Sequence, residues 1–158
     1  MKLRIYLFFL VGALSFLSLS CSSDSSTGSV PISGESSSVE LAERIISLSP
    51  TATEILFAIE AGDQVVAVDD QSNFPAEAPM TSLSGFTPNI ESIAEYQPDL
   101  VVASYDPGDL VSGLEALDVT TVLQPAASSM EDTYSQINEL GVLTGRQSEA
   151  SELIERIK

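Results

Sequence analysis

Short apolar runs alternate with amphipathic stretches from residue 44 to the end of the chain. Several of these runs are continuous in β-branched and aliphatic residues, a pattern that favours strands covered on both faces of a parallel sheet. The predicted strands span 44–49, 64–68, 99–104 and 119–124. Because helical periodicity separates them, the alternation predicts an α/β fold, with an open, mostly parallel sheet, flanking helices and right-handed crossovers.

The predicted helices fill the intervals between the strands and the end of the chain. In the first, Pro50 suits the opening turn and Gly62 is placed to end the helix. Thr51 and Glu54 have the spacing of a capping box. The others are a short helix from Ile90 that Pro98 ends, and helices over 107–117, 130–143 and 147–158. The last pattern is still amphipathic at Lys158, so we expect a second half to follow it.

The first residues have the pattern of a secretory signal. Lys2 and Arg4 precede an apolar run over 5–19, as n- and h-regions do, and this run is too short to favour a membrane span. Cys21, the only cysteine, follows small residues at the expected cleavage point, and the arrangement resembles a bacterial lipoprotein signal. Such signals usually carry an aliphatic residue at the place of Ser18, which leaves a spare thiol as the alternative. We predict that Cys21 is lipidated.

Composition divides the rest of the chain. The predicted lipoprotein signal peptide occupies 1–20, and a Ser-rich stretch over 21–42 lacks a periodic apolar face, which is typical of a flexible tether. The predicted α/β region follows at 43–128, and 129–158 is predicted to be helical. A tether between a lipidated cysteine and a folded domain indicates an extracytoplasmic protein that is anchored to a membrane.

The charge and the missing residue types narrow the function. A formal net charge of −17 disfavours nucleic acid and anionic membrane surfaces as partners. The sequence has no histidine, which excludes Ser-His-Asp and Cys-His catalysis and histidine-based metal sites. It also contains no P-loop, GxGxxG or GxSxG motif. These absences favour a binding protein over an enzyme, and we predict no catalytic residue, no metal site and no cofactor.

Ligands of open α/β sheets bind at the carboxyl ends of the strands, where helix N-termini and loops converge. Here these ends are Ser49-Pro50-Thr51, Asp69-Asp70-Gln71, Ser104-Tyr105-Asp106 and Gln124-Pro125. Ser49 and Thr51 have an alternative role as helix caps. Asp69 and Asp70 are a candidate Mg²⁺ pair. Phosphoacceptor domains need a further aspartate and a lysine, however, and Lys158 is the only lysine of the predicted folded region.

The segments RIISLSPTATEILFAI, VVAVDDQSNFP, GFTPNIESIAEYQPDLVVAS and GVLTGRQSEASELIERI resemble the cobalamin- and iron-siderophore-type substrate-binding proteins of ABC importers. The likeness extends over 44–158, in the order and near the spacing of that family. Its members resemble a clamp, with two α/β lobes joined by a long helix and the ligand held between them. The resemblance implies that 43–128 is the N-terminal lobe, that 129–158 begins the inter-lobe helix, and that the second lobe is absent.

The resemblance also implies which residues contact the ligand. Phe86 falls in a loop where the family often places an aromatic ring against the ligand, and such a ring suits a corrin or another large flat molecule. Pro50 and Thr51 line the floor of the cleft in the family. Gln71 matches a position where a relative uses tyrosine. Tyr105, at the end of the strand 99–104, completes the predicted ligand set.

Glu91 matches the acidic residue that the family inserts into an arginine pocket of the permease. The helical pattern independently predicts that Glu91 is exposed, because Ile90 and Ile93 face inward. Its place in the first helical turn favours a negative charge. An ordinary solvated acid at a helix start is the alternative.

The ligand is predicted from the basic residues that the cleft lacks. Arg44, Arg146, Arg156 and Lys158 are the bases of the folded lobe, and none falls on a predicted cleft loop. Anionic siderophores usually need cationic partners, so a corrinoid is favoured. We therefore expect a lipid-anchored protein that delivers a corrinoid to an ABC permease. The alternatives are a ferric-siderophore or haem-binding protein of the same family and, from another class, an extracytoplasmic hydrolase or a structural lipoprotein.

Overall fold

The computed structural model describes residues 40–158. The predicted signal peptide, the lipidation of Cys21 and nearly all of the tether lie outside the described residues. Between residues 40 and 158, no helix has the length and apolarity that spanning a membrane requires.

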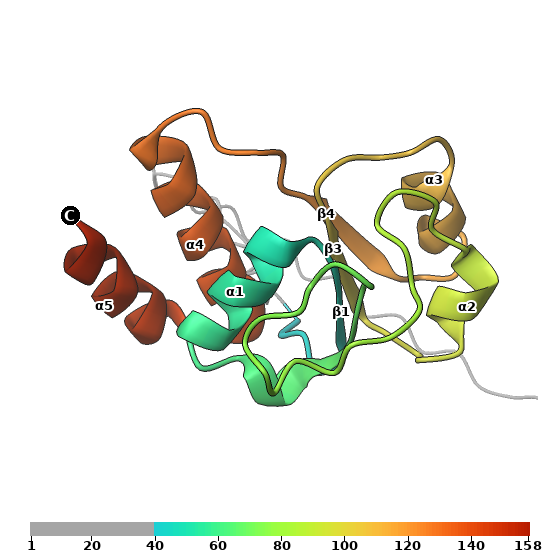
Figure 1. Cartoon of the computed structure of the whole chain (residues 1–158), viewed down its shortest axis with the longest axis horizontal. Coiled ribbons are helices and arrows are strands. Elements are labelled where there is room, and N and C mark those ends of the chain that lie inside the picture. Colours follow the sequence, from blue (N-terminus) through green and yellow to red (C-terminus); the bar gives the residue numbers. More distant parts are fainter. Residues whose placement is uncertain (1–39) are drawn as a thin grey trace, which may run out of the picture. The chain divides into compact units, whose positions relative to one another are not determined.

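A four-stranded parallel sheet organises the lobe (Figure 1). Its strand order is β2-β1-β3-β4. The strands are β1 (Ile45–Leu48), β2 (Val65–Val68), β3 (Leu100–Ala103) and β4 (Thr120–Leu123). The helices are α1 (Pro50–Ala58), α2 (Ile90–Ala94), α3 (Leu110–Glu115), α4 (Met130–Thr144) and α5 (Gln147–Ile157), with a 3₁₀ turn η1 at Gly62–Gln64. Each strand lies within a predicted apolar run, so the predicted parallel α/β fold is confirmed.

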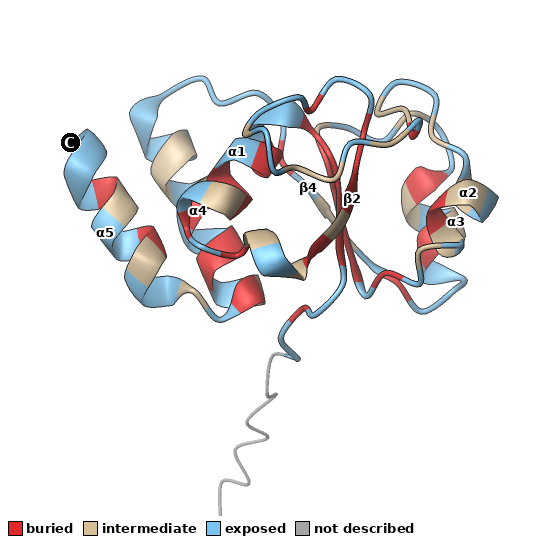
Figure 2. Cartoon of the chain, turned by 60° about the horizontal axis from the view of Figure 1, so that its bottom comes forward, coloured by how far each residue is buried: buried red, intermediate tan, exposed pale blue. Residues whose placement is uncertain are grey.

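Helices cover both faces of the sheet, and each face has its own apolar core. The core with α1, α4 and α5 contains Leu100 and Val102 of β3, whereas the core with α2 and α3 contains Val101 and Ala103 (Figure 2). The strand is continuously apolar because every one of its residues enters one core or the other. β4 differs, since it lies at the sheet edge and both of its end residues are exposed.

Ser49 caps the start of α1. Its hydroxyl accepts a hydrogen bond from the amide of Ala52 at 3.4 Å, and Pro50 occupies the opening turn as predicted. Thr51 is exposed and its side chain makes no hydrogen bond within residues 40–158, so the predicted capping box with Glu54 is wrong. The reason is that β1 ends one residue before Ser49, which leaves this serine as the last extended residue before the helix.

The end of α1 also differs from the prediction. The helix stops at Ala58, and Glu60, not Gly62, takes a left-handed backbone with φ of 61°. The amides of Glu60 and Ala61 donate to carbonyls in the last turn of α1, at 3.1 and 2.8 Å, which is the Schellman pattern. Ala61 is fully buried, so core packing fixes the helix end before the glycine.

α3 begins at Leu110, later than the predicted start at residue 107. The Asp106 carboxylate accepts a hydrogen bond from the Leu110 amide at 3.1 Å. This contact holds 107–109 as a loop before the helix. The predicted start of the helix at residue 107 is therefore three residues too early.

α4 and α5 form the predicted pair of closing helices, separated by Gly145. A capping box of Ser129 and Asp132 starts α4. Hydrogen bonds from the Ser128 hydroxyl and amide and from Ser129 lower the pKa of the Asp132 carboxyl. The two helices approach closely at Gly141, where a Cβ would lie 2.6 Å from the Cβ of Ala150. That α5 begins a long inter-lobe helix stays a prediction.

Candidate functional site

The carboxyl ends of the central strands β1 and β3 meet in a small pocket. Its volume is about 120 Å³, and it is lined by Leu48, Pro50, Asp69, Gln71, Gly85, Phe86, Ser104 and Tyr105. Four of the five predicted ligand residues, Pro50, Gln71, Phe86 and Tyr105, therefore lie around one cavity. They come from segments far apart in the sequence, and the strand order β2-β1-β3 brings those segments together. We call this cavity the aromatic pocket.

Phe86 is presented to the pocket by a tight turn. The Ser84 hydroxyl accepts hydrogen bonds from the amides of Phe86 and Thr87, each at 3.2 Å. Gly85 has no room for a side chain, since a Cβ there would lie 2.6 Å from the Leu48 carbonyl oxygen. The Phe86 side chain stays 66% exposed. Core packing therefore does not explain the position of this ring.

Tyr105 and Gln71 stand on the other strand ends. Tyr105 follows β3 and is 43% exposed, so this lobe leaves much of its ring uncovered as well. The Gln71 side chain donates a hydrogen bond to Asp70 at 3.1 Å, which holds it near the exposed rim. Two uncovered aromatic rings thus share the pocket with polar groups.

Thr51 lines a second, adjoining pocket of about 110 Å³. Its lining residues are Ser49, Thr51, Ala52, Ser104, Gln124, Pro125, Ala126, Ala127 and Gln136. Ser104 belongs to both pockets, and its hydroxyl donates to the Ser49 hydroxyl at 3.0 Å. Thr51 is therefore near the other predicted ligand residues without sharing their pocket.

Glu91 lies on another part of the lobe. It is exposed in the first turn of α2, as predicted, and the Asn89 side chain caps this helix by accepting from the Ser92 amide at 2.7 Å. Glu91 lines neither pocket.

No basic side chain of residues 40–158 lines the aromatic pocket or its neighbour. Arg44 donates to the carbonyls of Tyr96 and Gln97. Arg146 lies 3.4 Å from Asp63, and Lys158 pairs with a glutamate of its own helix. Within this range, no group of histidine, cysteine or acidic side chains has the arrangement of a metal site.

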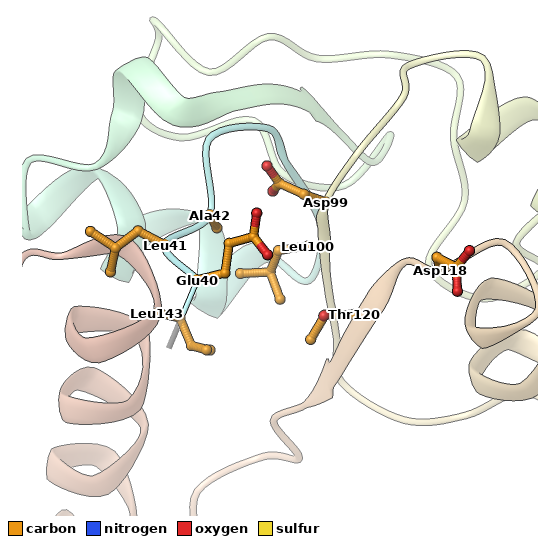
Figure 3. Close-up of a pocket in the computed structure, with 8 residues that line it drawn as sticks. All are labelled: Glu40, Leu41, Ala42, Asp99, Leu100, Asp118, Thr120 and Leu143. Atoms are coloured by element: carbon orange, nitrogen blue, oxygen red, sulfur yellow. The ribbon is translucent and has the colours of Figure 1, made fainter. Parts of the chain in front are cut away.

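A larger cavity lies at the opposite end of the sheet. It has a volume of about 380 Å³ and is lined by Glu40, Leu41, Ala42, Asp99, Leu100, Asp118, Thr120 and Leu143 (Figure 3). The Asp99 carboxylate in this cavity accepts hydrogen bonds from the backbone amides of Glu43 and Arg44 at 2.9 to 3.1 Å. This cavity lies at the amino ends of the strands, whereas open α/β sheets bind ligands at the carboxyl ends. The volume of a cavity therefore does not identify the ligand site of this lobe.

The sequence places Asp69 and Ser104 at strand ends where ligands are expected, but it does not assign them to the predicted ligand set. Ser104 ends a predicted strand and Asp69 follows one, and Asp69 is also a candidate metal ligand with Asp70. The structure buries Asp69 to 2% exposure and places it in the lining of the aromatic pocket. The apolar run ending at Val68 was a usable signal, because the residue after a buried strand remains near the core.

Known proteins share both the sequence pattern and the fold. The uncharacterised ABC transporter substrate-binding lipoprotein YvrC of Bacillus subtilis is 29% identical over 121 residues, covering 73% of this chain and 38% of that protein. A vitamin B12-binding protein of Vibrio parahaemolyticus is 35% identical over 105 residues, covering 64% and 38%. A solved structure of a possible iron-binding periplasmic solute-binding protein from Staphylococcus epidermidis matches with a TM-score of 0.66 and 28% identity, covering 74% of this chain and 48% of that one.

These relatives are named as binding proteins, in agreement with the resemblance seen in the sequence. The chain spans 38% of the length of the two curated relatives. The family model described as "Periplasmic binding protein" matches residues 45–158. The chain belongs to the periplasmic binding protein family.

Proposed function

We propose that the protein is a lipid-anchored, extracytoplasmic substrate-binding protein that delivers a corrinoid to an ABC importer. The aromatic pocket is the observation that carries this proposal, because Phe86 and Tyr105 are exposed there beside Pro50 and Gln71. One relative is named as a vitamin B12-binding protein and another as an ABC transporter substrate-binding lipoprotein, which supports the ligand and the anchor at Cys21.

Because the aromatic pocket is small, we expect this lobe to form only one wall of the ligand-binding site. A corrin ring is much larger than a cavity of about 120 Å³, so it rests across the mouth and does not enter. The exposed rings of Phe86 and Tyr105 lose water when a flat molecule covers them, and this burial favours binding. The matched region is 38% of each of the two curated relatives, and we propose that the opposite wall is supplied from outside residues 40–158.

The charge of the ligand distinguishes corrinoids from siderophores and haem. Ferric siderophores and haem carry anionic groups that favour cationic partners, and no basic side chain of residues 40–158 lines the pocket. A corrinoid with neutral amide arms does not need such partners. A siderophore or haem-binding protein is the second candidate, and the similarity to a possible iron-binding protein favours it.

Replacing Phe86 with alanine is expected to weaken corrinoid binding about tenfold, because an uncovered aromatic anchor contributes about 1–2 kcal/mol. Isothermal titration of the full gene product with cyanocobalamin and dicyanocobinamide measures this. Phe74→Ala is the matched control, since Phe74 is 64% exposed and lines neither pocket. Binding of ferric siderophore or haemin with no heat from either corrinoid at micromolar concentration would replace the corrinoid assignment.

We assign permease docking to Glu91, which is exposed and lies outside both pockets. Glu91→Gln is expected to slow association with the permease several-fold at low salt, because a rim charge acts mainly on orientation and on-rate. Surface plasmon resonance against an immobilised ABC permease from the same organism measures the rate. Glu95→Gln changes another exposed acid next to the same helix and should leave the rate unaltered. Equal rates for both variants and the parent protein would count against docking at Glu91.

A further inference from the structure

Asp69 is a buried acid in the wall of the aromatic pocket. The residue is 2% exposed, yet it lines the cavity together with Phe86 and Tyr105. Its backbone amide donates to the Ser47 carbonyl at 3.0 Å, which fixes it beside the end of β1. The sheet therefore fixes the backbone of Asp69 beside the pocket.

The two carboxylate oxygens of Asp69 have different surroundings. Oδ1 accepts a hydrogen bond from the Ser72 amide at 2.9 Å. Oδ2 has no hydrogen-bond donor among residues 40–158, and it lies 2.8 Å from the place of a Cβ on Gly85, another residue of the pocket wall. Oδ1 thus stabilises the local turn, whereas Oδ2 is available to a ligand in the cavity.

A ligand that covers the pocket removes water from Oδ2, and a carboxylate oxygen that is then left without a donor is unfavourable. No basic side chain of residues 40–158 lines the pocket to compensate for it. A ligand group that donates a hydrogen bond to Oδ2 relieves this cost. A ligand carboxylate at the same place is repelled, because like charges at short range in a partly desolvated pocket disfavour each other.

We infer that Asp69 is a specificity-determining residue, which accepts a hydrogen bond from an N–H donor of the bound ligand and discriminates against carboxylate-bearing ligands. The inference rests on the proposed function and deepens it: among ring-shaped ligands, the pocket selects those whose arms end in primary amides. Gln71 and Ser104 form the polar remainder of the same wall.

Asp69→Asn tests the inference without removing the turn. The asparagine oxygen keeps the place of Oδ1, because the Ser72 amide needs an acceptor there. The amide nitrogen then takes the place of Oδ2, so that an acceptor becomes a donor. Dicyanocobinamide, whose arms carry amides, and dicyanocobyrinic acid, whose arms carry carboxylates, are titrated into the full gene product by calorimetry.

The parent protein is expected to bind the amide ligand at least about tenfold more tightly than the acid, as a hydrogen bond to a buried charge implies. Asp69→Asn is expected to reduce that ratio about tenfold or to reverse it. Asp109→Asn makes the same chemical change at an exposed residue that lines neither pocket, and should preserve the ratio. If Asp69→Asn does not fold, Asp69→Ser removes the carboxylate and should also reduce the ratio.

The outcomes separate the two proposals. Corrinoid binding by the parent protein with an unchanged amide-to-acid ratio in the Asp69 variants would overturn the role of Asp69 and leave the proposed function intact. Failure of the parent protein to bind either corrinoid would overturn the proposed function, and the role of Asp69 with it.

Discussion

Replacing Leu56 with alanine is expected to lower the free energy of unfolding by about 3 kcal/mol. Leu56 is fully buried in α1, in the core that α1 shares with α4 and α5. Truncating a buried leucine removes apolar contacts and leaves a cavity that the surrounding helices fill only in part. Because α1 begins at Pro50, its loosening also reaches the wall of the aromatic pocket.

Urea unfolding followed by circular dichroism measures the loss. The midpoint should fall while the denaturant slope stays the same, since the surface exposed on unfolding hardly changes. Leu117→Ala is the matched control, because Leu117 is 50% exposed and should change the stability by less than about 0.5 kcal/mol. Equal losses for the two variants would show that the core on this face is not packed as described.

Gly141→Ala is expected to destabilise the packing of α4 on α5 by about 1–3 kcal/mol. The new methyl group would lie 2.6 Å from the Ala150 Cβ and 3.2 Å from the Arg146 carbonyl oxygen. The helices must separate to accept it, although alanine favours the helix itself. The overlap outweighs that preference, so the net change is destabilising.

A double-mutant cycle with Ala150→Gly identifies the contact. The second change removes the methyl group that Gly141→Ala meets, so the pair should be more stable than the two separate losses imply, by about 1 kcal/mol. Relief is incomplete because the Arg146 carbonyl remains in place. Additive losses in urea unfolding would mean that the two helices do not meet at these positions.

The strands and helices were predictable because they depend on local periodicity and on burial. The residues of β3 enter two different cores, and a run that is apolar at every position is the sequence mark of that arrangement. The ends of the helices were less predictable. Thr51 and Gly62 have suitable residue types, but the end of β1 and the burial of Ala61 decide where α1 starts and stops.

The residues of the site were more predictable from the sequence than the way in which they share pockets. The resemblance implies ligand contacts for Pro50, Thr51, Gln71 and Phe86, and the strand end adds Tyr105. The structure brings all of these except Thr51 around one cavity. Which oxygen of Asp69 is free depends on a turn that no sequence pattern specified. Contacts of this kind join segments that are distant in the chain, so residue types alone do not reveal them.

The aromatic pocket is lined by two kinds of segment, the ends of sheet strands and a loop. Leu48 and Ser104 extend from the central strands of the sheet, while Gln71 and Phe86 belong to 69–89, a connection without a helix or an extended strand. Within this connection, Leu83 and Ala78 pack with the two apolar cores, but Gln71 and Phe86 are exposed and belong to neither, so substitutions at these two positions alter the mouth of the pocket and leave both cores untouched. Ligand preference can therefore diverge during evolution through this one segment with little loss of stability, as is usual where a loop rests on a rigid scaffold.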